Sequence, residues 1–260
     1  IQIEAYDDCF KEPLRSILEN EGIRVLSEPN PIEKPDCVIR SSAIPEDSNL
    51  VSPWISQNIP VYRRGDFLAQ FTAEKKVVAI VGSHGKTSTT AMLSWALQEA
   101  GFSFSYLVGG LFTDNQLPPG RYEESDWVVM EVDESDGSID SFSPEITIAL
   151  NCEWDHVDLY DSREAIGKTF QALFRRTVKT IITPGNSELA EWARVEKNKE
   201  LSFFHCNKEL SRYEENNISA VCCAGLSMGI NFNELSFLKF PGVSRRNSVL
   251  YESASRTVVE

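Results

Sequence analysis

The sequence has no long hydrophobic run and no excess of basic residues. No stretch approaches the roughly 20 apolar residues that a membrane-spanning helix needs, and the first ten residues, IQIEAYDDCF, show neither the basic nor the apolar part of an export signal. With 25 Lys and Arg against 39 Asp and Glu, the formal net charge of −14 argues against a nucleic-acid partner. We therefore expect a cytoplasmic protein that neither inserts into membranes nor binds nucleic acid.

Paired cysteines and internal repeats are also missing. The six cysteines are Cys9, Cys37, Cys152, Cys206, Cys222 and Cys223. None belongs to a C-x-x-C pair, so the spacing of a zinc site or a redox motif is absent, and reduced thiols are the simplest interpretation. The 260 residues, 42% of them hydrophobic, fit two globular domains, each large enough to bury a core.

The most informative segment is 79–97, AIVGSHGKTSTTAMLSWAL. The apolar run 77–81 predicts a buried strand, a turn with two glycines follows, and from Ser88 onward the apolar residues have helical spacing. Glycines let backbone N–H groups point inward, Lys86 adds a positive charge, and the hydroxyl of Thr87 is a potential metal ligand. The candidate phosphate-binding residues are Gly82, Ser83, His84, Gly85, Lys86, Thr87 and Ser88.

This turn departs from the strict P-loop pattern G-x-x-x-x-G-K-[ST]. That pattern would place glycine at position 80, where the chain has isoleucine, so the match is to a shorter variant, G-x-x-G-K-T. A chance G-K-T in a surface turn is the alternative. The predicted strand before it and helix after it favour a nucleotide-binding P-loop.

Two further predicted strands end in acidic segments. The strand 127–132 runs into EVDESDGS, where Glu131 leaves the strand first and is the best candidate ligand for a hard Mg²⁺ ion beside phosphates. The strand 146–150 runs into NCEWDHVDLY, where His156 would suit a second metal. A solvated acidic loop and an ordinary, partly exposed histidine are the alternatives.

The remaining pattern alternates strands and helices, which is typical of an α/β protein with a mainly parallel sheet. Strands are further expected at 3–8, 23–26, 37–41, 61, 105–108, 147–151 and 180–183. Helices are expected at 11–22, 50–57, 87–100, 163–176, 187–195 and 217–228, with a short helix and a polar link in 65–76. The polar, turn-rich segment 111–125 is expected to be a loop that could close over a ligand.

The motifs GSHGKTST, EVDESDGS and NCEWDHVD, in this order and spacing, resemble the ATP-binding central domain of the Mur ligases of peptidoglycan synthesis. Upstream, SSAIPEDSN and VYRRGDFLAQF resemble the UDP-binding domain of that family, and downstream FPGVSRRN resembles the hinge before its third domain. The resemblance covers most of the chain.

The resemblance implies a domain order. Residues 1–72 would form a Rossmann-like UDP-sugar-binding domain without its first strand and Gly-rich turn. Residues 73–242 would form the central ATP-binding domain, shortened near 207–215, and 243–260 would begin the hinge and C-terminal domain. Because the amino-acid site of the family belongs to its third domain, we expect the 260-residue chain alone not to turn over.

The resemblance also implies a reaction. ATP phosphorylates the lactyl carboxylate of UDP-N-acetylmuramate, the amine of an amino acid or short peptide attacks the acyl phosphate, and phosphate leaves to give an amide. Lys86, Glu131 and His156 would be catalytic, with Mg²⁺ held by Thr87, Glu131 and His156. ATP would also contact Asn217 and Arg245.

Other substrate contacts match less completely. Asp7, Ser41 and Ser42 would contact the UDP-sugar. The adenine-contacting motif H-N-x-x-N-x-x-A appears with Tyr213 and Glu214 in its first two places, so of its His and Asn positions only Asn217 matches.

The resemblance leaves several functions open. Branches with a carbamylated lysine would place it near position 171, which is glutamine here. This favours the branch that adds L-alanine, with murein tripeptide ligation as the alternative. A nucleotide-binding remnant without catalysis is a second alternative, and an enzyme similar to folylpolyglutamate synthase is a distant third.

Overall fold

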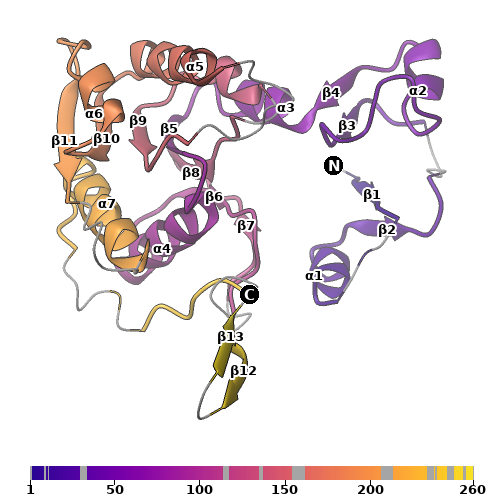
Figure 1. The fold of residues 1–260 in the computed structure, drawn as a ribbon. Helices are drawn as coiled ribbons and strands as arrows, with labels where there is room; N and C mark the ends of the chain where they lie inside the picture. Colours follow the sequence, from indigo (N-terminus) through magenta and orange to yellow (C-terminus); the bar gives the residue numbers. More distant parts are fainter. Residues whose placement is uncertain are drawn as a thin grey trace. The chain divides into compact units, whose positions relative to one another are not determined.

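The computed structural model in Figure 1 shows two compact units, Ile1–Phe67 and Leu68–Glu260. It describes residues 2–8, 10, 12–29, 34–113, 117–134, 137–153, 162–205, 213–232, 237, 239–244, 249–253 and 256–259. The break between the units falls within helix α3, Arg64–Phe71. The domain limits expected from the sequence, after residues 72 and 242, stay predictions. Among the described residues, no helix has the length and apolar character needed to cross a bilayer.

The first unit contains two small parallel sheets. Its elements are β1 (Glu4–Tyr6), α1 (Leu14–Asn20), β2 (Arg24–Leu26), β3 (Val38–Arg40), α2 (Ser52–Ser56), β4 (Val61–Arg63) and the start of α3. Strand β1 pairs with β2, and β3 pairs with β4. Gly22 has a φ of +77°, a left-handed conformation that suits glycine, and it follows the end of α1 as the sequence predicts.

Arg40 organises the loop that follows β3. This residue is only 9% exposed. Its guanidinium donates to the carbonyl oxygen of Ile44 at 2.7 Å and to a carboxylate oxygen of Glu46 at 2.8 Å. A buried guanidinium needs such acceptors, so the segment 41–46 is folded around it.

The second unit contains a seven-stranded sheet. Its elements are β5 (Lys76–Val81), α4 (Lys86–Glu99), β6 (Ser105–Leu107), β7 (Gly120–Arg121), β8 (Trp127–Glu131), a 3₁₀ helix η1 (Ser138–Ser141), β9 (Ile146–Ala149), α5 (Arg163–Arg176), β10 (Thr180–Pro184), α6 (Glu188–Ala193), β11 (Glu200–Phe204), α7 (Tyr213–Ser227), β12 (Val249–Ser253) and β13 (Arg256–Val259). The strand order is β11-β10-β9-β5-β8-β6-β7, and the strands are parallel except β7. Strands β12 and β13 form a separate antiparallel pair.

Helices cover both faces of this sheet, which makes three layers (Figure 1). On one face, α4 and α7 pack with strand side chains such as Val78 and Ile80. On the other, α5 and α6 pack with Val77 and Ala79. Because successive strand residues point to opposite faces, the continuous apolar run of β5 buries both of its sides.

Most elements expected from the sequence are present. The predicted helix 163–176 has the observed ends of α5, where the side chain of Ser162 accepts a hydrogen bond from the Ala165 N–H. The expectation that 111–125 is entirely loop was wrong, because Gly120–Arg121 pairs with β6. Strand β11 was also missed, since short edge strands with exposed positions lack a clear apolar run.

Candidate functional site

Three neighbouring strands end at one edge of the sheet. Strand β5 lies between β8 and β9, and all three are parallel, so the segments that follow them meet at the same edge. These segments are the glycine turn, the acidic segment after β8 and the segment that begins at Asn151. The prediction that the three motifs share one edge of one sheet is confirmed for the strands that carry them.

The glycine turn needs both of its glycines. Gly82 has a φ of +139°, and a Cβ atom there would lie 3.0 Å from the backbone oxygen of Asn151. Gly85 has a φ of +86° and immediately precedes α4, and a Cβ there would meet Asn217 Oδ1 at 3.2 Å. A side chain at either position would strain the backbone and crowd its neighbour. The turn therefore places its own backbone and the first residues of α4 next to each other at this edge of the sheet.

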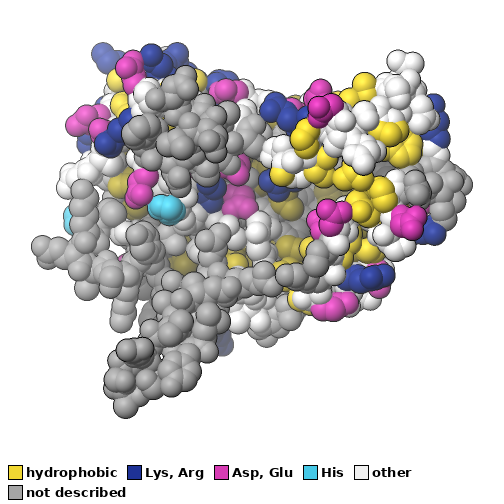
Figure 2. Space-filling model, turned by 45° about the vertical axis from the view of Figure 1, so that its right-hand side comes forward, with side chains coloured by type: hydrophobic (Ala, Val, Ile, Leu, Met, Phe, Trp, Pro, Cys, Tyr) yellow, Lys and Arg dark blue, Asp and Glu magenta, His cyan; other side chains and the backbone are white. Residues whose placement is uncertain are grey.

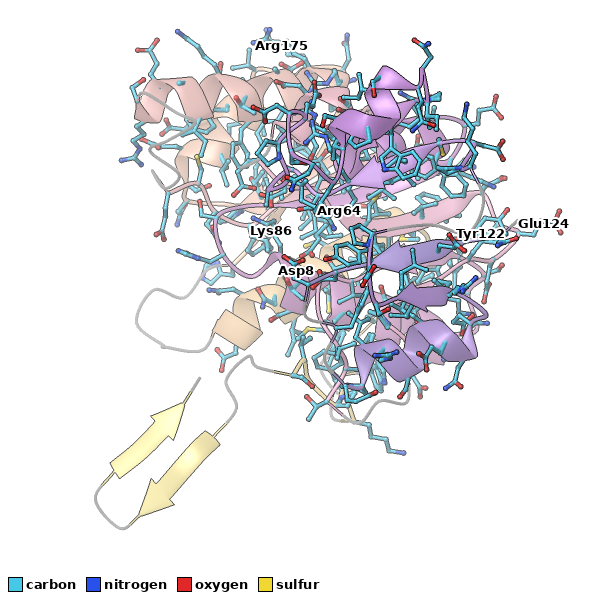
Figure 3. All side chains as sticks on the ribbon, turned by 90° about the vertical axis from the view of Figure 1, so that its right-hand side faces the viewer. Asp8, Arg64, Lys86, Tyr122, Glu124 and Arg175 are labelled. Carbon is cyan, nitrogen blue, oxygen red and sulfur yellow. The ribbon has the colours of Figure 1, made fainter. Side chains whose placement is uncertain are left out.

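Lys86 is held by three oxygen groups. Its ammonium lies 2.7 Å from the carbonyl oxygen of Gly82 and 3.1 Å from both carboxylate oxygens of Glu134. An oxygen of Asp133 is 3.8 Å away. Lys86, labelled in Figure 3, therefore has an acidic partner in Glu134.

Glu134 is a site residue that the sequence reasoning missed. It is fully buried at 0% exposure. Burial raises the pKa of its carboxyl above the ordinary value, and the positive charge of Lys86 offsets part of that rise. The acidic segment 131–138 was recognised, but sequence spacing could not tell which of its carboxylates turns toward Lys86.

Thr87 and Glu131 lie together beside this lysine. The Thr87 hydroxyl donates to a carboxylate oxygen of Glu131 at 2.9 Å. The Glu131 carboxylate occupies the space that a side chain at position 109 would need, since a Cβ on Gly109 would collide with its Oε1. Gly110 similarly leaves room for Thr87, because a Cβ there would lie 3.1 Å from the Thr87 methyl group. The two glycines after β6 thus allow the predicted metal-ligand pair to form.

The segment after β9 is joined to the glycine turn. The Asn151 side chain accepts from the His84 N–H at 2.8 Å and donates to the His84 carbonyl oxygen at 2.9 Å. The Glu153 N–H donates to the Ser83 hydroxyl at 2.9 Å, and the Glu153 carboxylate lies 3.3 Å from His84 Nε2. Sequence reasoning noticed this segment for His156 and missed Asn151.

The other predicted site residues are placed as follows. Asn217 is buried in α7, and its amide lies against Gly85. Ser88 is in the first turn of α4. Asp7, Ser41 and Ser42 belong to the first unit, where the Ser41 hydroxyl accepts from the Ala43 N–H at 3.3 Å. His156, Arg245 and the side chains of Tyr213 and Glu214 lie outside the described residues.

Among the described side chains, a metal at this site would also need oxygens from a ligand. Within the described ranges, no group of three or more His, Cys, Asp or Glu side chains could hold a metal ion. Thr87 and Glu131 supply two hard oxygen donors, and Mg²⁺ commonly combines one or two carboxylates with phosphate oxygens and water. The pair fits a magnesium ion that arrives with a nucleotide.

A mainly parallel sheet with a glycine turn, a lysine and a Thr–Glu pair at its carboxyl edge defines an α/β protein of the P-loop type. Residues 80–225, more than half of the chain, match the family model described as the Mur ligase middle domain. The chain belongs to the Mur ligase family. The family and the α/β fold class predicted from the three motifs are confirmed.

Individual relatives agree with this assignment. The UDP-N-acetylmuramate--L-alanine ligase of Dictyoglomus turgidum is 35% identical over 192 residues, which cover 70% of this chain and 40% of that relative. The chain spans 40% or less of the length of this and two further curated relatives.

Two solved structures show the shared fold. The UDP-N-acetylmuramate:L-alanyl-gamma-D-glutamyl-meso-diaminopimelate ligase from Neisseria meningitides has a TM-score of 0.76 and 20% identity, and the match covers 93% of this chain and 91% of that chain. The UDP-N-acetylmuramate-alanine ligase from Thermotoga maritima has a TM-score of 0.75 and 22% identity, with coverages of 96% and 65%.

Proposed function

We propose that this chain binds the triphosphate of ATP together with Mg²⁺, as part of an ATP-dependent amide-bond ligase that adds L-alanine to UDP-N-acetylmuramate. The observation that carries the proposal is the meeting of Lys86, Thr87 and Glu131 at the ends of adjacent parallel strands. The choice of substrate is supported by the relative that shares 35% of its residues with this chain over 192 positions.

Lys86 is the residue that would neutralise the transferred phosphoryl group. Its ammonium already has three oxygen partners within 3.1 Å, so an oxygen-lined position for its charge exists. A phosphate oxygen would take a place beside or instead of the Glu134 carboxylate. Positive charge held where negative charge develops lowers the barrier to phosphoryl transfer.

Thr87 and Glu131 would hold the magnesium ion. When bound, this ion would neutralise charge on the β- and γ-phosphate oxygens. The task of the two side chains is to present a hydroxyl and a carboxylate oxygen at the same point, which the 2.9 Å contact between them achieves. His156, proposed for a second magnesium, stays a prediction, as do Asn217 and Arg245 at ATP and Asp7, Ser41 and Ser42 at the UDP-sugar.

Calorimetry with Mg-ATP tests the phosphate site directly. We expect Lys86→Ala to weaken binding by about 10- to 100-fold, the cost of one charge-assisted hydrogen-bonded contact. Lys168→Ala is the matched control, because Lys168 pairs with Glu164 at the surface of α5 and is 70% exposed. Equal affinities for the wild type and Lys86→Ala would remove the lysine from the site.

The ligase reaction needs a separate assay. The proposed ligase of which this chain is a part is mixed with UDP-N-acetylmuramate, ATP and radiolabelled L-alanine. The labelled amide product is then counted. Transfer of L-alanine supports the proposal, whereas transfer only of the L-alanyl-γ-D-glutamyl-diaminopimelate peptide would favour murein tripeptide ligation. Absence of both transfers with Mg-ATP binding retained would favour a nucleotide-binding remnant without catalysis, whereas loss of Mg-ATP binding as well would overturn the proposal.

A further inference from the structure

The Asn151 side chain hydrogen-bonds to both backbone groups of His84, which lies in the proposed phosphate-binding turn. Its Oδ1 accepts from the His84 N–H at 2.8 Å, and its Nδ2 donates to the His84 carbonyl oxygen at 2.9 Å. An amide that pairs in this way with one residue's N–H and C=O copies the pairing between adjacent strands. The two residues are 67 positions apart, so the contact joins separate parts of the chain.

Two further contacts also hold the turn against the segment that follows β9. The Glu153 N–H donates to the Ser83 hydroxyl, which in turn donates to the Glu153 carbonyl oxygen at 3.2 Å. Gly82 packs so closely on this segment that a Cβ there would be 3.0 and 3.1 Å from the backbone oxygen and nitrogen of Asn151. Residues 82–84 of the turn therefore rest on residues 151–153, which extend from β9.

A turn that binds phosphate through its backbone depends on the orientation of its peptide groups. If one peptide rotates, its N–H no longer points at the ligand, and the turn must be reordered at the expense of binding. Asn151 uses both hydrogen-bonding groups of His84, so rotation at this residue would break two bonds. Since Asn151 is half-buried at the end of β9, its amide contributes hydrogen bonding more than core packing.

We propose that Asn151 is a positioning residue that holds the 82–85 turn in its phosphate-binding conformation. This inference rests on the proposed binding of ATP phosphates by the turn. Asn151 itself does not touch the reacting atoms in this scheme. It acts through the backbone of His84, and it links that backbone to the segment that continues toward His156.

The Asn151→Asp variant tests the contact, because aspartate has nearly the same shape but changes its hydrogen bonding with pH. The ionised form accepts from the His84 N–H but faces the His84 carbonyl with an oxygen, whereas the protonated form can donate to it. At about pH 8 we expect Mg-ADP affinity to fall about tenfold, the equivalent of one to two lost hydrogen bonds. Toward about pH 5, where aspartate begins to be protonated, affinity should recover relative to the wild type.

Three comparisons isolate this effect. Asn151→Ala should lose affinity to a similar extent without recovery at low pH. Asn198→Asp makes the same chemical change at an exposed turn residue and should leave affinity unchanged. Because the His84 imidazole and the Glu153 carboxylate lie beside the turn, every affinity is divided by that of the wild type at the same pH.

Hydrogen exchange of the nucleotide-free chain supplies a second measurement. Asn151→Ala should speed exchange in the peptide that contains residues 82–85, while exchange in β10 stays as in the wild type. Wild-type affinity with unchanged exchange in both Asn151 variants would overturn the inference and leave the proposed function standing. If the wild-type chain bound no nucleotide, the proposed function would fall and this inference with it.

Discussion

The second unit buries its hydrophobic side chains far more completely than the first. In the second unit, residues such as Phe112, Phe170 and Phe174 are fully buried between the sheet and its helices. Among the described residues 2–67, by contrast, Val51 and Ile59 are the only buried hydrophobic side chains, and neither α1 nor α2 contains a buried residue. Figure 2 shows hydrophobic side chains at the surface among charged ones, and Ile3, Ile39 and Ile55 of the first unit are 50, 46 and 44% exposed.

This difference gives a physical reason for the proposed phosphate site to lie in the second unit. Pairs of parallel strands are marginally stable by themselves, whereas a larger sheet covered on both faces holds its strand ends at fixed positions. A site that relies on contacts of 2.7 to 3.1 Å around one ammonium needs such support. The following predictions test the contrast between the two units.

The largest effect should come from removing a core side chain of the second unit. Phe170→Ala should lower the free energy of unfolding of that unit by about 3–5 kcal/mol, because it loses buried area and leaves a cavity. Ile39→Ala, at a 46% exposed position of the first unit, should cost less than about 1 kcal/mol. Urea denaturation followed by hydrogen exchange of peptides from each unit measures both. Similar costs at the two positions would contradict the contrast.

A pair of glycine substitutions separates backbone strain from damage to the site. Gly22→Ala should cost the first unit about 1 kcal/mol, since only its positive φ resists a side chain and nothing lies within 4 Å of the added atom. Gly109→Ala should instead push the Glu131 carboxylate away from Thr87. The Mg²⁺ concentration needed for half-maximal nucleotide binding should then rise about tenfold. Calorimetry at varied Mg²⁺ checks this, with Glu131→Gln expected to match Gly109→Ala. A normal Mg²⁺ titration for Gly109→Ala would exclude the displacement.

The buried carboxyl of Glu134 should make the second unit sensitive to pH. Because its folded pKa is raised above the ordinary value of 4.5, the unfolded chain loses this proton first as pH rises. Stability therefore falls from about pH 4.5 upward until the folded pKa is passed, by about 1.4 kcal/mol for each pH unit between the two values. Glu134→Gln should reduce this fall, as measured by urea denaturation across the pH range. An unchanged pH dependence would show that another group causes it.

The smallest expected effect is a difference in the rate of alkylation between a cysteine of the second unit and a cysteine of the first unit. Burial raises the pKa of the Cys152 thiol to about 11, so about one molecule in a thousand carries the reactive thiolate at pH 8. Cys37 in the first unit is exposed and should be alkylated much earlier by iodoacetamide, as read by peptide mass spectrometry. Faster modification of Cys152 would show that the segment after β9 opens readily.

Local patterns allowed much of the second unit to be predicted. Each of its main signals lies within a few residues: the apolar run 77–81, the glycines that follow it and the helical spacing after Ser88. Strand β5 and helix α4 form at the positions that these signals predict. Thr87 and Glu131 were also picked out from the sequence, because Thr87 follows the glycine turn after β5 and Glu131 ends the neighbouring strand β8. Short edge strands such as β7 and β11 were missed, since pairing with a neighbour defines them more than their own composition does.

By itself, the sequence determined the glycine turn, the alternation of strands and helices, and the family, because these depend on residue types at short spacings. Only the tertiary structure decided that Glu134 pairs with Lys86 and that Asn151 holds His84. These contacts join residues 48 and 67 positions apart. Their existence depends on which strands lie side by side and on the room left by neighbouring side chains, and neither is encoded in a local pattern.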